Sequence, residues 1–131
     1  MTPRFTSRSR LMLHITKEFH FSASHRLEHL PSDHQCARLH GHNYIIELKL
    51  SAAPDQLTEP GFVRDYGDLA DFKKWLDHTL DHRHLNDIIE DRNPSAENMA
   101  MWIYDQWTER YPELSAVRVS ETDKTWAEYR P

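Results

Sequence analysis

Two stretches of alternating side chains constrain the fold of this chain most. In residues 13–25 the apolar side chains share one parity, with Lys17 as the exception, and the polar side chains share the other. Residues 40–50 alternate in the same way. Alternation over this length is typical of a strand with one buried and one exposed face. The sequence therefore predicts two long, half-buried strands, joined by the polar segment 26–39.

Three histidines fall on the apolar parity of these strands. His25 ends the first stretch, and His40 and His42 begin the second. Residues i and i+2 of a strand point to the same face, so His40 and His42 can present their imidazoles side by side. Three neutral imidazoles with one open position are typical of a catalytic zinc site. We therefore predict Zn²⁺ as a cofactor; His20, on the opposite parity, is the competing third ligand, and histidines without a metal are the alternative.

The rest of the chain predicts two helices followed by two shorter strands. Asp68 can cap a first helix, whose apolar residues recur at helical spacing over 69–80. A second helix begins at Pro94–Ser95 and ends at Pro112. Strands follow around Val117 and at 126–129. The order β-β-α-α-β-β predicts an α+β fold, a four-stranded antiparallel sheet with two helices on one face.

Composition narrows the class of protein. The 131 residues suit one domain, and a formal net charge of −5 argues against a nucleic-acid partner. A single cysteine excludes an internal disulfide and fits a reducing compartment, and no apolar run reaches membrane-spanning length. Residues 1–11 carry arginines but no signal-peptide core. We expect them to be a disordered lead-in to a single catalytic domain, 12–131, in the cytoplasm.

The cysteine and an Asp-His pair are candidates for proton transfer. Cys36 lies in a polar loop four residues before His40, where a nearby cation favours the thiolate; a small core residue is the alternative. Asp81 and His82 adjoin just past the first helix. A carboxylate beside an imidazole suits a proton relay with the thiol, although a solvated helix end explains the pair equally well.

Further polar residues are candidates for substrate binding. Glu121 shares the parity of Val117 at a strand end, where a carboxylate can accept two adjacent N–H donors; an exposed strand-end glutamate is the alternative. Ser95 and Glu97 open the second helix, and helix capping and the helix dipole also account for them.

Taken together, these motifs resemble the 6-pyruvoyltetrahydropterin synthase family, and within it the queuosine-pathway 6-carboxy-5,6,7,8-tetrahydropterin synthases. The resemblance covers roughly residues 12–130. Arg64 and the segment 123–126 depart from the family pattern. The segments that carry the resemblance are Phe-Ser-Ala-Ser-His at 21–25, His-Gly-His-Asn-Tyr at 40–44, Asp-Tyr-Gly-Asp-Leu at 65–69, Leu-Asp-His at 80–82, Asn-Pro-Ser-Ala-Glu-Asn at 93–98 and Ser-Glu-Thr at 120–122.

The resemblance implies a tunnelling fold and an intersubunit active site. Trimers close their sheets into a barrel, and two trimers stack as a homohexamer. The implied roles are zinc binding for the histidine triad, proton abstraction for Cys36, a relay for Asp81 and His82, and anchoring of the pterin ring for Glu121. Ser95 and Glu97 would help to hold the pterin.

The resemblance also implies a substrate, 7,8-dihydroneopterin triphosphate. In the queuosine branch, carbon–carbon cleavage releases acetaldehyde and triphosphate and leaves 6-carboxytetrahydropterin. In the biopterin branch only triphosphate leaves, and a 6-pyruvoyl side chain forms. The three-residue gap between Cys36 and His40 resembles the queuosine branch. A non-catalytic zinc- or pterin-binding module is a third possibility.

Overall fold

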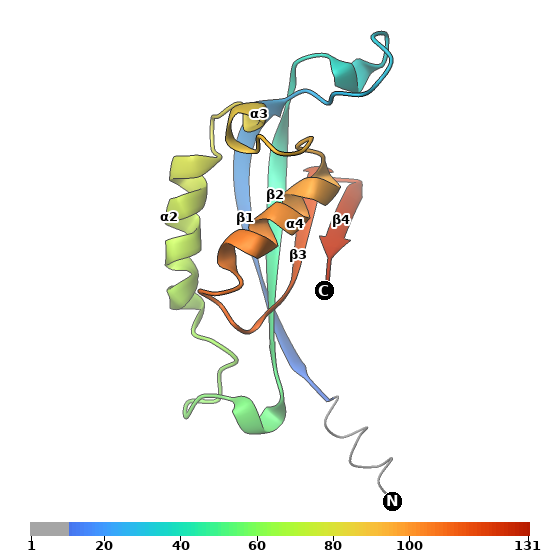
Figure 1. Cartoon of the computed structure of the whole chain (residues 1–131). Helices are drawn as coiled ribbons and strands as arrows, with labels where there is room; N and C mark the ends of the chain where they lie inside the picture. The colour runs from blue at the N-terminus through green and yellow to red at the C-terminus, as the bar shows by residue number, and fades with distance from the viewer. Residues whose placement is uncertain (1–10) are drawn as a thin grey trace, which may run out of the picture.

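The computed structural model describes residues 11–131 (Figure 1). The predicted lead-in, residues 1–11, therefore lies outside the described residues except for its last position. Within the described part no helix is both long and apolar enough to cross a membrane.

The two long strands form where the alternation predicts them. β1 (Leu13–His25) pairs antiparallel with β2 (His40–Ala52), so that His25 lies opposite His40. β3 (Leu114–Thr122) and β4 (Thr125–Tyr129) complete a sheet with the order β1-β2-β3-β4. The predicted four-stranded antiparallel sheet is therefore confirmed.

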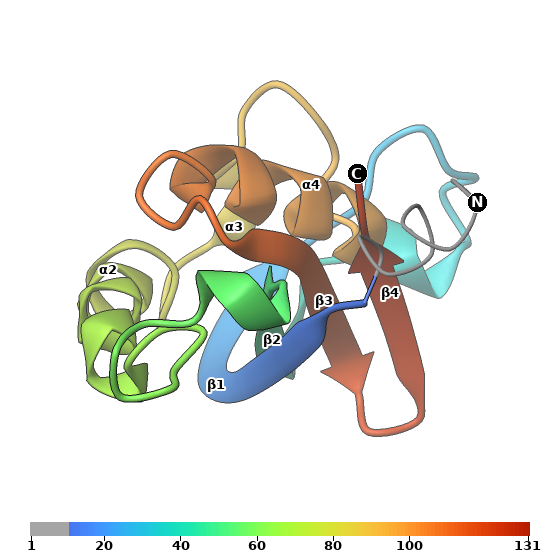
Figure 2. The same cartoon turned by 90° about the horizontal axis from the view of Figure 1, so that it is seen from below.

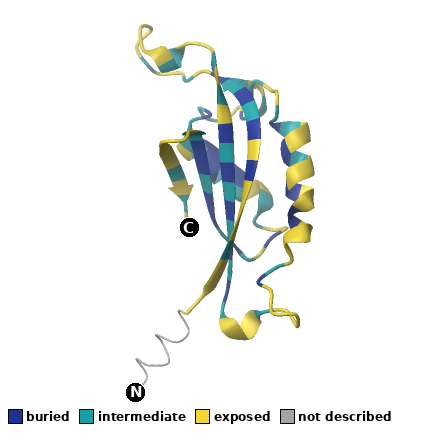
Figure 3. Cartoon of the chain, turned by 180° about the vertical axis from the view of Figure 1, so that it is seen from behind, coloured by how far each residue is buried: buried dark blue, intermediate teal, exposed yellow. Residues whose placement is uncertain are grey.

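Two helices lie on one face of this sheet. α2 (Ala70–Thr79) runs beside β1, and α4 (Ala96–Trp107) packs across β3 and β4 (Figures 1 and 2). Seen from behind, the sheet shows its other face, over which none of the described helices lies (Figure 3). The predicted one-sided arrangement is thus confirmed.

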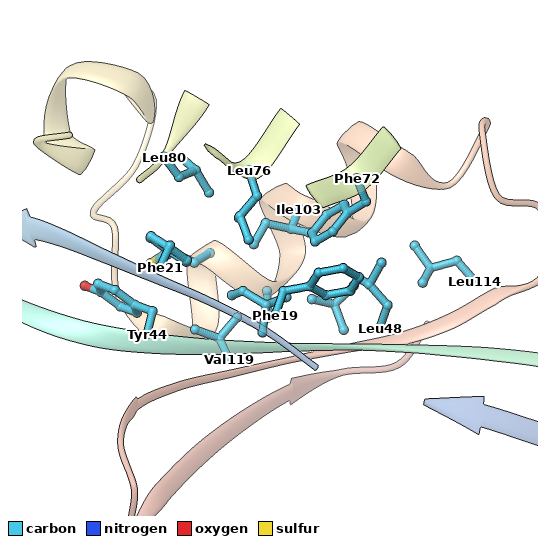
Figure 4. Close-up of a cluster of buried hydrophobic side chains, with 14 of the residues drawn as sticks. Phe19, Phe21, Tyr44, Leu48, Phe72, Leu76, Leu80, Ile103, Leu114 and Val119 are labelled. Atoms are coloured by element: carbon cyan, nitrogen blue, oxygen red, sulfur yellow. The ribbon is translucent and has the colours of Figure 1, made fainter. Parts of the chain in front are cut away.

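The hydrophobic core fills the space between the sheet and the helices (Figure 4). Phe19 of β1 meets Phe72 of α2 edge-on, with ring centroids 4.8 Å apart. Phe21 stacks on Tyr44 at the same centroid distance, closer to the histidine end of the sheet. Aromatic pairs in these geometries add about 1 kcal/mol each to the free energy of burial. The strand parity that buries these rings also turns the three histidines toward the helix side.

Two details differ from the sequence prediction. Asp68 is not the cap of α2: the Asp65 carboxylate accepts the Gly67 N–H at 2.8 Å and begins a 3₁₀ turn over Tyr66–Leu69, which leads directly into α2. Between the two predicted helices lies a third, short helix, α3 (Leu85–Ile88), which was not predicted. Both differences reflect local capping and packing that hydrophobic spacing does not encode.

The departure from the family pattern at Arg64 has a structural explanation. Its guanidinium donates to Glu113 at 2.9 and 3.2 Å and to Asp68 at 3.2 Å, and it lies over the Tyr111 ring. These contacts tie the segment before α2 to the segment before β3, far from the histidines.

Candidate metal centre and its surroundings

The three predicted histidines lie together at one end of the sheet. His25 and His40 are direct cross-strand partners, and His42 follows two residues along β2. Their ring centroids are 4.6 to 5.0 Å apart. One nitrogen from each ring lies within 4.8 Å of the other two. His20 points to the opposite face, with a side chain that is 67% exposed, and takes no part in the cluster.

Backbone carbonyls set the tautomers of two of these rings. His25 Nδ1 lies 2.8 Å from the Pro94 carbonyl oxygen, and His40 Nδ1 lies 2.6 Å from that of Arg38. A carbonyl oxygen only accepts hydrogen bonds, so each Nδ1 carries the proton and each Nε2 presents a lone pair. The two Nε2 atoms face each other at 3.0 Å. When both rings are neutral, two acceptors this close are stabilised by a cation between them.

The third ring completes the set of lone pairs. His42 Nε2 is buried and has no hydrogen-bond partner among the described residues. Its nearest charged neighbour is Glu121 Oε2 at 3.7 Å. An orphaned buried nitrogen is rare in folded proteins and requires an explanation. A metal ion bound by all three Nε2 atoms would satisfy it.

Burial favours the neutral form of His25 and His42, which is the form that binds a metal. Burial, and to a smaller extent the neighbouring histidines, lower the pKa of His25 from 6.5 to about 4, against the opposing effect of the Pro94 carbonyl. Burial also lowers the pKa of His42, although the Glu121 carboxylate opposes this. Deprotonated imidazoles bind divalent metals without first releasing a proton. Three histidines with an open position are the ligand set of catalytic zinc, so these residues fit the metal.

Tyr44 supports the cluster from below. Its ring is fully buried, and its hydroxyl lies 3.2 Å from His25 Nδ1. Burial and the charge of Glu121 raise the pKa of this hydroxyl, which therefore stays protonated. Tyr44 and the two carbonyl groups were not predicted as parts of the site, because only the folded structure reveals their contacts with the histidine rings.

Asp81 and His82 lie together at the edge of β1. The Asp81 carboxylate accepts the Ser22 N–H at 3.0 Å and lies 2.9 Å from His82 Nδ1. These two contacts, in that order, lower the pKa of Asp81. The His82 N–H donates to the Ser22 carbonyl, and the residue has a left-handed backbone (φ 59°). A non-glycine residue in this region is often found at a functional site.

Cys36 lies apart from that pair within the chain. It belongs to the 3₁₀ turn Gln35–Ala37, on the loop that projects from the top of the sheet in Figure 1. Its side chain is half-buried, and its N–H donates to His34 Nδ1 at 3.0 Å. Among the described residues, no hydrogen bond or ion pair joins Cys36 to Asp81 or His82.

The three predicted substrate-binding residues lie in different settings. Glu121 is near the end of β3, beside an irregularity in the β3–β4 pairing, with its side chain 25% exposed next to His42. Ser95 accepts the Asn98 N–H at 3.2 Å and so caps α4, which is the alternative to substrate binding that the sequence also indicated. Glu97 is exposed in the first turn of α4.

A four-stranded antiparallel sheet with helices on one face, and three imidazoles converging at its end, defines a tunnelling-fold protein with a candidate metal centre. Residues 14–131 match the family described as 6-pyruvoyl tetrahydropterin synthase, and the chain belongs to this family. A structure of Caenorhabditis elegans 6-pyruvoyl tetrahydropterin synthase superposes with a TM-score of 0.79 at 26% identity, covering 92% of this chain and 96% of that one.

Named relatives in other organisms are similar over most of the chain. A Synechocystis protein named 6-carboxy-5,6,7,8-tetrahydropterin synthase is 36% identical over 121 residues, which are 88% of this chain and 91% of that protein. A Rickettsia conorii protein of the same name is 31% identical over 108 residues, covering 68% of this chain and 75% of that protein.

Proposed function

We propose that this chain is a zinc-dependent 6-carboxy-5,6,7,8-tetrahydropterin synthase. It would convert 7,8-dihydroneopterin triphosphate and one water molecule to 6-carboxytetrahydropterin, with release of acetaldehyde and triphosphate, in queuosine biosynthesis in the cytoplasm. The observation that carries the proposal is the convergence of three imidazole nitrogens, two of them with lone pairs fixed by carbonyl groups. The names of the relatives in Synechocystis and Rickettsia support the choice of product.

The histidine triad would hold the metal and leave one position for substrate. Zinc bound there supplies Lewis acidity, which acidifies a hydroxyl group of the substrate side chain. His25 and His40 are already held in the required tautomer. Glu121, which lies beside His42, would accept the N–H edge of the pterin ring through both carboxylate oxygens.

Proton transfer would fall to Cys36 with Asp81 and His82. The Asp81 carboxylate lies 2.9 Å from His82 Nδ1, which leaves Nε2 of an exposed ring free to exchange a proton. Because Cys36 is apart from this pair within one chain, we propose that neighbouring subunits bring them together. β1 and β4 are the two edges of the sheet, and open edges are able to pair with another chain. A homohexamer of two stacked trimers would provide such sites.

Ser95 and Glu97 are further candidates for substrate binding. The Ser95 hydroxyl accepts the Asn98 N–H, which leaves its own proton available to a ligand. Glu97 is exposed on the same turn. We propose that they contact the pterin from the first turn of α4, in addition to the capping role of Ser95.

Product analysis tests the proposed function. The zinc-loaded protein is incubated with 7,8-dihydroneopterin triphosphate, and the products are identified by mass. We expect 6-carboxytetrahydropterin and acetaldehyde, and no turnover by Cys36→Ala with zinc still bound. A 6-pyruvoyl product would assign the chain to the other branch of the family. Absence of any turnover, with zinc and pterin still bound, would favour the non-catalytic module.

A further inference from the structure

Two asparagine side chains hold the segment that follows β1. The Asn86 side chain accepts the Arg26 N–H at 3.0 Å and donates to the Arg26 carbonyl at 2.9 Å. The Asn93 side chain makes the same pair of bonds to Glu28, both at 2.9 Å. A carboxamide has one acceptor and donors in one plane, like a peptide group. The two side-chain amides therefore bond to Arg26 and Glu28 in the way that the backbone of a neighbouring strand would.

The residue between the two clamped positions is bonded to the Cys36 turn. The Leu27 N–H donates to the Cys36 carbonyl at 2.9 Å. Residues 26–28 thus form a short ribbon with the asparagines on one side and Cys36 on the other. The location of the thiol therefore depends on how firmly this ribbon is held.

Asn93 has a second connection, which Asn86 lacks. The next residue, Pro94, gives its carbonyl oxygen to His25 Nδ1 at 2.8 Å. The Asn93 carbonyl is itself held by the Asn98 side chain at 3.0 Å, in the first turn of α4. The position of Asn93 consequently sets the acceptor that orients a metal-ligating ring. Such partners of metal ligands contribute strongly to metal affinity.

We propose that Asn93 is a positioning residue that fixes the Cys36 turn and the His25 imidazole relative to each other. The purpose of this arrangement, to hold a thiol at a set distance from a bound metal, rests on the proposed function. The geometry does not depend on that function. The Asn93 side chain bonds to Glu28 in the ribbon, and the next residue, Pro94, accepts a hydrogen bond from His25. Asn86 holds the same ribbon, and within residues 11–131 its side chain makes no hydrogen bond to the histidine triad.

The matched pair Asn93→Ala and Asn86→Ala tests this inference. Each variant loses two hydrogen bonds to the same ribbon. Zinc affinity is measured by competition with a chromophoric chelator, and ribbon mobility by residue-resolved amide hydrogen exchange, with circular dichroism to check folding. We expect Asn93→Ala to lower zinc affinity about tenfold and to speed exchange of the Glu28 amide. Asn86→Ala should speed exchange at Arg26 and leave zinc affinity within about twofold.

Equal zinc affinity in Asn93→Ala and the wild type, or an equal loss in both variants, would overturn the proposal. If Asn93→Ala does not fold, Asn93→Asp replaces it. The aspartate keeps the acceptor for the Glu28 N–H but loses the donor, so a smaller loss of zinc affinity is expected, and an unchanged affinity contradicts the inference. None of these measurements uses the substrate. A wild-type protein that binds no zinc would refute the proposed function instead.

Discussion

Acid should destabilise the metal-free protein through His25. This ring is buried, with 1% of its surface exposed, and burial lowers its pKa from 6.5 to about 4. The unfolded chain therefore binds a proton at this position below about pH 6.5, whereas the folded protein binds one only below about pH 4. Stability rises with pH wherever the unfolded state binds more protons, so this contribution is lost as the pH falls between these values.

The pKa values fix the size of the effect. At about 1.4 kcal/mol per pH unit, the whole window corresponds to about 3 kcal/mol of unfolding free energy. Between about pH 7.5 and pH 5, most of the window is crossed, and the expected loss from His25 alone is about 2 kcal/mol. Other histidines add their own pH dependence, so a variant is needed to isolate the contribution of this ring.

Urea unfolding with a chelator present, at these two pH values, provides the assay. His25→Gln removes the titrating group, and its stability should fall by about 2 kcal/mol less than that of the wild type. His20→Gln is the matched control, because that side chain is 67% exposed on the other face of the sheet. It should behave as the wild type does. The reasoning is refuted if His25→Gln and the wild type lose the same free energy over this range.

Three further changes test the site and its supports. His42→Ala should reduce bound zinc to below about a tenth of the wild-type content, measured by elemental analysis, and full occupancy would contradict the ligand assignment. Ser95→Ala removes the acceptor of the Asn98 N–H and should cost about 1 kcal/mol in urea unfolding; an unchanged midpoint would show that the cap contributes nothing. Asp81→Asn should lower kcat about 100-fold, because the His82 ring loses its anionic partner, and an unchanged kcat would exclude the relay.

The two long strands, and the shared face of their three histidines, were predictable because alternation encodes them. Residues 13–25 were predicted as a strand, and β1 has these bounds. The apolar parity of His25, His40 and His42 predicted that they share a face. The irregularity in β2 lies between Lys49 and Leu50, away from the histidines, so it does not reverse their parity.

Long-range polar contacts were not predictable from the same patterns. Asn93 and Glu28 are 65 positions apart, and nothing in hydrophobic spacing connects them. The cap of the turn before α2 depends on Asp65 rather than Asp68, since both are acidic residues near a helix start and only the backbone path separates them. The gap between Cys36 and the Asp81–His82 pair is likewise a property of the fold.

The setting of the histidines couples metal binding to folding. The cluster lies at the end of the core, beside the buried Tyr44 ring, so that His25 and the Nε2 atom of His42 are buried. Without a metal, His42 Nε2 has no hydrogen-bond partner among residues 11–131, and the Nε2 atoms of His25 and His40 lie 3.0 Å apart, an arrangement that destabilises the native state when both rings are neutral. A ligand that binds only the native state stabilises it by about 2.7 kcal/mol at a hundred times its Kd. The burial that lowers the pKa values of His25 and His42 therefore also makes the stability of this end of the sheet depend on the metal.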